Sequence, residues 1–153
     1  MRILAVGERM PRWVEVVVAE YARRLPPQLP LTVAAVRAGH RGTGGGTRAV
    51  QAEGERLLQG LRAEEFAVAL DEHGRQFTTL QLAGWLGKRL QEGRDLAFLI
   101  GGPDGLASEV RARCELKWSL SSLTLPHPLV RVVLAEQLYR AHTVISGHPY
   151  HRE

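Results

Sequence analysis

The chain has 153 residues, of which 44% are hydrophobic and 24% are charged, and a formal net charge of +4. These values are typical of a globular protein and exclude a disordered or fibrous chain, while the length suits a single domain spanning residues 1–153. No apolar run reaches the roughly 18 residues that cross a bilayer, and the first apolar stretch is too short for a secretion signal, so we expect a cytoplasmic protein without membrane contact.

The first half of the chain alternates apolar runs with segments of helical spacing. Residues 2–6 form a short apolar run that predicts a buried strand, and residues 11–25 repeat apolar side chains at helical intervals. Prolines then end this helix, and a second strand is expected at 31–36. A loop at 39–47 is so dense in glycine that no single conformation is favoured until something binds. A helix is expected from there to Gly60.

The second half repeats this alternation. Thr78 and Gln81 have the spacing of a capping box, so a helix begins there and ends at Glu92. The other expected elements are strands at 66–70, 95–100 and 117–120, and helices at 107–114 and 129–145. Strands that alternate with helices predict an α/β fold, in which a mainly parallel sheet is flanked by helices. Ligands of such sheets bind beyond the carboxyl ends of the strands, which singles out the loops after Leu70, Ile100 and Leu120.

Two of these loops have unusual sequences. GGPDG at 101–105 is neither a dinucleotide fingerprint nor a Walker loop, but its glycines would let a ligand approach the backbone closely. SSLTLPHP at 121–128 is stiff and rich in hydroxyls, and Leu120, Leu123 and Leu125 would supply apolar walls for a flat base. Each loop also has a plain interpretation, as a tight turn and as an ordinary connection between a strand and a helix.

The C-terminal segment HPYHRE at 148–153 is the third candidate. Tyr150 is suited to stacking on a base, and His151 and Arg152 are suited to an acidic proton or a phosphate. The alternative is a solvated tail, as termini often are. The positive net charge favours a polyanion such as RNA as a partner, without requiring one.

Several other residues receive a structural interpretation. Arg131 and Arg140 lie on one side of the last helix, where either phosphate contacts or pairs with another helix are expected. Cys114 has no partner for an intrachain disulfide and no zinc-ligand spacing, so we expect no metal. The remaining expectations place Trp13, Trp85 and Trp118 in the core and His40 and His73 on the surface.

Three stretches taken together carry a family resemblance. They are IGGPDG at 100–105, WSLSSLTLPHPLVRVVLAEQLYRA at 118–141 and HPYHRE at 148–153, and AVGERMPRWV at 5–14 extends the match over nearly the whole chain. On these motifs the chain resembles the ribosomal RNA large-subunit pseudouridine N3-methyltransferases of the SPOUT superfamily.

The resemblance implies a C-terminal trefoil knot, an obligate homodimer and S-adenosyl-L-methionine (SAM) as the cofactor. It also implies that the substrate is a pseudouridine of large-subunit ribosomal RNA, recognised in the assembled ribosome. By the family pattern, the residues that bound the cofactor are Leu70, Gly101, Gly102, Leu120, Ser121, Ser122, Leu123, Thr124 and Leu125.

The chemistry of this reaction defines the catalytic candidates. Methyl transfer from a sulfonium needs no metal, because the cofactor supplies the chemical drive and the protein positions the reactants. The N3 atom of pseudouridine carries a proton, so a protein group must either accept this proton or stabilise the anion that its loss leaves. We assign these roles to His151 and Arg152, with Tyr150 stacking on or orienting the base, and we expect the tail of one subunit to complete the site of the other.

Two other functions remain open at this point. One is a ribosome-associated protein of the same fold that holds RNA without transferring a group, and it would not bind SAM. The other is a doubly wound enzyme that uses a nucleotide cofactor on a small molecule, which the missing glycine fingerprint disfavours.

Overall fold

Five short segments pair into one parallel sheet in the computed structural model, which describes residues 1–42 and 46–151. The strands are β1 (Arg2–Val6), β2 (Thr32–Val36), β3 (Phe66–Gln76), β4 (Leu96–Ile100) and β5 (Leu116–Ser119). Their order in the sheet is β2-β1-β4-β3-β5. All four pairings are parallel, which places the carboxyl ends of the strands at one edge.

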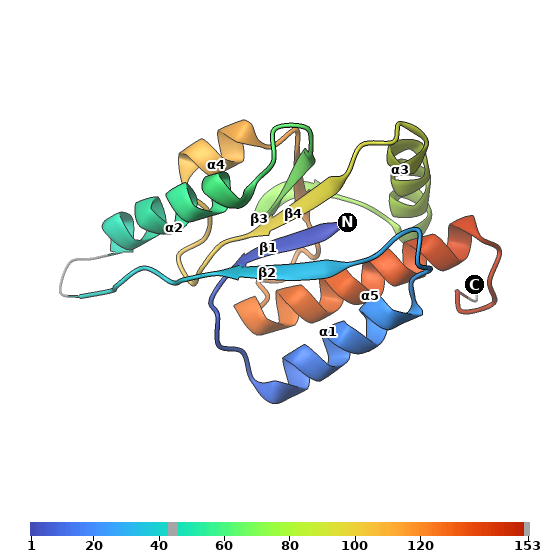
Figure 1. Ribbon diagram of the computed structural model, residues 1–153, viewed down its shortest axis with the longest axis horizontal. Helices are drawn as coiled ribbons and strands as arrows, with labels where there is room; N and C mark the ends of the chain where they lie inside the picture. Colours follow the sequence, from blue (N-terminus) through green and yellow to red (C-terminus); the bar gives the residue numbers. More distant parts are fainter. Residues whose placement is uncertain (43–45, 152–153) are drawn as a thin grey trace.

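Helices cover both faces of this sheet (Figure 1). The helices α1 (Arg12–Arg24), α3 (Thr79–Gln91) and α5 (His127–Ile145) share one apolar cluster with the sheet. The helices α2 (Gly46–Gly60) and α4 (Ser108–Arg113) share a second cluster on the opposite face. The result is a three-layer α/β/α arrangement, as the alternation of strands and helices predicts.

The two cores follow from the alternation of side chains along each strand. In β1, Ile3 and Ala5 belong to the cluster with α1, α3 and α5, whereas Leu4 and Val6 belong to the cluster with α2 and α4. Every residue of β4 is buried, because this central strand is covered by helices on both faces.

The expected α/β class and parallel sheet are confirmed, and most boundaries agree to within two residues. Thr78 caps α3 through the predicted capping box with Gln81. One strand differs: β3 does not end at Leu70 but continues to Gln76. The pairing with β5 breaks after Leu70 and resumes at Arg75, so the polar segment between them leaves the ladder and then rejoins it.

Of the three tryptophans expected in the core, two meet the expectation. Trp118 is buried and Trp85 packs against the first core, but Trp13 is 48% exposed, so its assignment is wrong. Helix α1 turns Val14 and Val18 toward the sheet, and these residues, one turn apart, form the buried stripe. Trp13 precedes that stripe and points away from it.

Two further observations concern the described part of the chain. Over residues 1–42 and 46–151, no helix combines the length and the apolar character needed to cross a bilayer. The glycine-dense loop expected at 39–47 includes residues 43–45, which lie outside the described residues.

Candidate functional site

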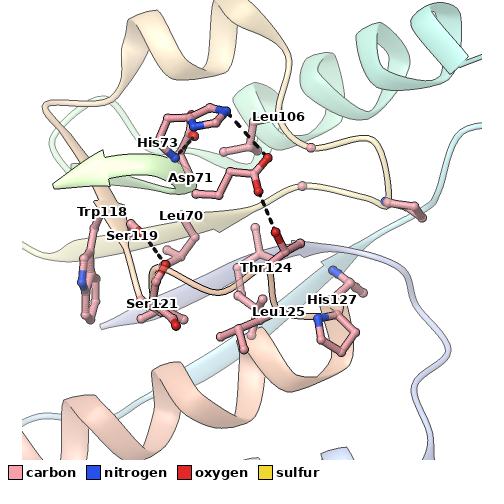
Figure 2. A pocket seen from close by; sticks show the side chains of 18 of the residues that line it. Leu70, Asp71, His73, Leu106, Trp118, Ser119, Ser121, Thr124, Leu125 and His127 are labelled. Atoms are coloured by element: carbon pink, nitrogen blue, oxygen red, sulfur yellow. Dashed lines mark hydrogen bonds and ion pairs between the residues drawn. The ribbon is translucent and has the colours of Figure 1, made fainter. Parts of the chain in front are cut away.

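A cavity of about 840 Å³ lies at the carboxyl ends of β3, β4 and β5. Figure 2 shows that its walls come from segments far apart in the sequence, with Leu70 in β3, Trp118 and Ser119 at the end of β5, and His127 at the start of α5. Eight of the nine residues assigned to the cofactor line this cavity: Leu70, Gly101, Gly102, Leu120, Ser121, Leu123, Thr124 and Leu125. Ser122 is exposed and is not part of the lining.

The first wall is the polar excursion of β3. The backbone N–H of His73 donates to the Asp71 carboxylate at 2.9 Å, which fixes a local turn. The hydroxyl of Thr124 donates to the Glu72 carboxylate at 3.2 Å and joins this wall to the loop after β5 (Figure 2). His73 is on the surface, as expected, and also lines the cavity.

The second wall is the GGPDG turn after β4. The N–H of Gly105 donates to the carbonyl oxygen of Gly102 at 3.0 Å, which closes the turn. A Cβ atom on Gly101 would lie 2.3 Å from the carbonyl oxygen of Gly105, so no larger residue fits there without opening the turn. Glycine is required at this position by the close approach of the backbone to itself.

The third wall is the hydroxyl-rich loop after β5. The Ser119 hydroxyl donates to the carbonyl oxygen of Ser121 at 2.8 Å, and the N–H of Leu123 donates to the Ser121 hydroxyl at 2.9 Å. These bonds hold the loop in a compact shape, with Leu125 half-buried and Leu123 73% exposed. The exposed leucine stands at the mouth of the cavity, where an incoming ligand or partner would meet it.

His127 lines the cavity at the start of α5, and Arg131 contacts this histidine from one turn later in the helix. Nη2 of Arg131 donates to the carbonyl oxygens of Val6 and Gly7 and lies 3.3 Å from Nε2 of His127. Burial, together with the nearby positive charge of Arg131, lowers the pKa of His127, so the imidazole is neutral at pH 7. Where a phosphate contact or a pair with another helix was expected, the guanidinium of Arg131 is buried and donates to backbone carbonyl oxygens at the end of β1.

The tail is described up to His151, and Arg152 lies outside the described residues. Helix α5 ends in a Schellman motif, in which His148 N–H donates to the carbonyl oxygen of Thr143 and Gly147 adopts a φ of 68°. The chain therefore turns back along its own helix, and the half-buried Tyr150 packs edge-on against Tyr139, with ring centroids 4.8 Å apart.

Tyr150 is held by charged groups as well as by packing. Its hydroxyl donates to the Glu136 carboxylate at 3.2 Å, and the Arg140 guanidinium lies 4.9 Å from its ring centroid. Burial, hydrogen bonding and the charge of Glu136 raise the pKa of Tyr150, so the phenol stays protonated at neutral pH. The expected pair of Arg140 with another helix is wrong, since it pairs with Glu136 one turn earlier in α5.

The two groups of predicted site residues therefore lie at opposite ends of α5. His127 and Val130 reach the cavity, whereas the tail follows Ile145. The tail folds back along α5 as far as Glu136, six residues after Val130, so about 9 Å of helix separates this contact from the cavity. Figure 1 shows the described tail leaving α5 at the end opposite its first turn. Within one chain, the described tail does not reach the cavity.

Some residues of the cavity were not identified from the sequence. Asp71 and Glu72 line the cavity but are not among the predicted site residues, although their place directly after the strand expected at 66–70 was a usable indication. Leu106 and Arg111 also line the cavity, and nothing in their sequence context pointed to it. Within the described part of the chain, no three His, Cys, Asp or Glu side chains come together in a group able to hold a metal ion.

A cavity at the carboxyl edge of a parallel sheet, walled by glycine-rich and hydroxyl-rich loops, is typical of α/β proteins that bind a nucleotide-like ligand. A family model described as "Predicted SPOUT methyltransferase" matches residues 1–151. The chain belongs to the SPOUT methyltransferase family.

Similar proteins cover essentially the whole chain. The chain is 51% identical, over 100% of its length and 99% of the relative, to "Ribosomal RNA large subunit methyltransferase H" of Thioalkalivibrio sulfidiphilus (strain HL-EbGR7). It is 50% identical to the protein of that name from Chromohalobacter salexigens and 48% identical to that from Ectopseudomonas mendocina (strain ymp), with 99% of both chains covered in each case.

Proposed function

We propose that this protein transfers a methyl group from SAM to N3 of a pseudouridine in large-subunit ribosomal RNA. The observation that carries the proposal is the joining of three loops, those after Leu70, Ile100 and Leu120, around one cavity at the carboxyl edge of the sheet. Membership of a methyltransferase family and the names of the relatives support the reaction and its RNA substrate. A ribosomal substrate also supports a cytoplasmic location.

The cavity residues suit the proposed cofactor. A volume of about 840 Å³ lies within the usual range for small-molecule sites. Leu70, Leu106 and Leu125 offer apolar surface for the adenine ring, and the glycine-rich turn offers backbone groups for hydrogen bonds. The carboxylates of Asp71 and Glu72 line the same cavity, and their charge is opposite to that of a sulfonium. When bound, SAM would supply the electrophilic methyl group.

We assign the remaining step, removal of the N3 proton, to residues of the C-terminal tail. The N3 proton of pseudouridine has to leave before or during transfer, because the protonated imide is a weak nucleophile. Tyr150 would stack on or orient the base, and His151 with Arg152 would accept the proton or stabilise the anion. The pKa of Tyr150 is raised, which favours positioning over proton acceptance for this residue.

A homodimer would bring these two groups of residues together. Within one chain, none of the described tail residues lines the cavity, so we infer that a complete site requires the tail of a second subunit. Trp13 and Val16 are 48% and 58% exposed and lie three residues apart on α1, which gives this helix an apolar outer surface suited to a subunit contact.

We also propose that the segment after β5 is threaded as the C-terminal trefoil knot of this family. The support is local: the polar excursion of β3 interrupts its pairing with β5, and Thr124 contacts Glu72 across the two loops.

Mass spectrometry of ribosomal RNA tests the function. Large-subunit RNA from cells that lack this protein should lose one methyl group from a single pseudouridine, and the purified protein with SAM should restore it on ribosomes. An unchanged methylation pattern in the deletion strain would contradict the proposal.

A further inference from the structure

Arg41 joins three segments of the chain beside the cavity. Its Nη1 donates to Glu53 Oε1 at 2.8 Å and to the carbonyl oxygen of Gly39 at 3.3 Å, and its Nη2 donates to Glu53 Oε2 at 3.2 Å. Its Nε donates to Asp104 Oδ2 at 2.8 Å. One guanidinium therefore connects the segment after β2, helix α2 and the GGPDG turn.

Glu53 has the most buried side chain of these three charged residues. Its side chain is 2% exposed, and its carboxylate also accepts from the backbone N–H of Gly39 at 2.8 Å. A carboxylate buried to this degree is stable only with hydrogen-bond donors and an opposite charge around it. The position of residues 39–41 is therefore set by α2, on which Glu53 lies.

The GGPDG turn packs directly on this ion pair. A Cβ atom on Gly102 would lie 2.7 Å from Glu53 Oε2 and 2.9 Å from Arg41 Nη2, so the turn and the pair are in contact. Asp104 Oδ2 lies 4.0 Å from the position of a Cβ atom on Gly46, at the start of α2. Gly102 and Asp104 both line the cavity, so any shift of the ion pair changes the cavity wall.

We propose that Arg41 is a positioning residue for cofactor binding, acting through Asp104. It holds the GGPDG turn in the shape that accepts the adenosyl group, and a filled cavity in turn orders the exposed basic segment around Arg37 and Arg41. The coupling is reciprocal, because two linked sites change each other's equilibria by the same factor. This inference rests on the proposed function, which supplies the identity of the ligand.

The expected effect is modest. The Arg41 and Asp104 side chains are 29% and 48% exposed, and an ion pair of this exposure changes an equilibrium by roughly two- to fivefold. The Arg41–Glu53 contact is more buried and also stabilises the fold, so Arg41→Ala alone is ambiguous. Asp104→Ala leaves the buried pair intact and removes the link to the turn together with a carboxylate that lines the cavity, so the double variant is needed to separate the two effects.

Calorimetric titration with S-adenosylhomocysteine tests the coupling in Asp104→Ala, Arg41→Ala and the double variant. Arg48→Ala, an exposed arginine on α2, is the matched control. We expect Asp104→Ala to bind roughly two- to fivefold more weakly and the double variant to bind no more weakly than Arg41→Ala, because both changes remove the same link. The control should bind as the unaltered protein does.

Limited trypsin digestion gives a second readout, which a purely structural role of Asp104 would not change. The ligand should slow cleavage after Arg37 in the unaltered protein and have no such effect in Asp104→Ala. The inference would be overturned if Asp104→Ala kept both the affinity of the unaltered protein and its ligand-dependent protection from trypsin. Additive losses of affinity in the double variant would also overturn it. Failure of the unaltered protein to bind S-adenosylhomocysteine would instead overturn the proposed function on which it rests.

Discussion

Nη2 of Arg131 lies 2.8 Å from the carbonyl oxygen of Gly7, although 124 positions separate the two residues in the sequence. The same nitrogen donates to the carbonyl oxygen of Val6 at 2.7 Å. These bonds fasten the first turns of α5 to the end of β1, beside the cavity. A residue that resembles an RNA contact in the sequence is therefore part of the framework of the site.

Replacing this guanidinium should destabilise the fold. Arg131→Met keeps most of the aliphatic chain and leaves two carbonyl oxygens without their charged donor, so we expect the free energy of unfolding to fall by about 2–3 kcal/mol. Urea denaturation measures the change. Arg12→Met, at an exposed position on α1, should stay within about 0.5 kcal/mol of the unaltered protein. An equally small effect of Arg131→Met would contradict the assignment.

Stability in acid should depend on Glu65. Its side chain is fully buried and accepts from Arg2 Nε at 2.6 Å and from the Arg62 N–H at 2.9 Å. Burial alone raises the pKa of this carboxyl, but these hydrogen bonds outweigh it and hold the pKa below 4.5. Its contribution is therefore present above pH 4.5 and is lost as the pH falls through the lower pKa of the folded state.

Glu65→Gln tests this dependence. We expect a loss of about 2–4 kcal/mol at pH 7, because the Arg2 guanidinium loses its buried partner, and a flatter decline in stability between about pH 5 and pH 3. Urea unfolding across that range measures both effects. The neighbouring exposed Glu64→Gln is the control, and the idea fails if both variants show the same acid profile.

The turn after β4 should not tolerate a methyl group at its first glycine. In Gly101→Ala the new Cβ atom would lie 2.3 Å from the carbonyl oxygen of Gly105, so the turn has to open. We expect affinity for S-adenosylhomocysteine to fall by about tenfold or more and stability to fall by about 1–3 kcal/mol. Calorimetry and urea unfolding measure the two effects.

Gly84→Ala provides the matched control. A Cβ atom there meets none of the described residues within 4 Å, and the position is exposed inside α3. Alanine should stabilise this helix by about 0.5–1 kcal/mol and leave ligand affinity unchanged. Equal losses of affinity in both variants would show that the turn has no special part in binding.

A mixed dimer tests whether two subunits share one site. A chain carrying His151→Ala is combined with a chain carrying Gly101→Ala, at a SAM concentration low enough that neither homodimer is active. If the tail of one subunit serves the cavity of the other, the mixed dimer contains one intact pairing and regains methylation of ribosomes. Inactivity of the mixed dimer, with both homodimers shown to exchange subunits, would count against sharing.

The fold was largely predictable because its determinants are local. The apolar runs of β1 and β4 and the capping box at Thr78 specify their elements within a few residues. The extension of β3 to Gln76 was not predictable, since its polar residues are strand only through pairing with β5. Trp13 was wrongly expected in the core because it is as apolar as the residues of α1 that face the sheet.

The site was predictable in its cofactor part but not in its geometry. The loops at 101–105 and 121–125 could be predicted because they follow strands, and parallel strands bring their carboxyl ends to one edge of the sheet. Basic and imidazole residues crowd the last 27 positions of the sequence, from His127 onward. The long helix α5 then separates them, with one group at the cavity and the other in a tail that folds back as far as Glu136.

A crystal structure of the protein with bound S-adenosylhomocysteine tests the central claim most directly. We predict that the adenosyl group lies between Leu70, Gly101 and Leu125, with its sulfur facing the opening beside the β3 excursion. Ligand density at another place on the surface, or a cavity filled by its own side chains under saturating ligand, would contradict it.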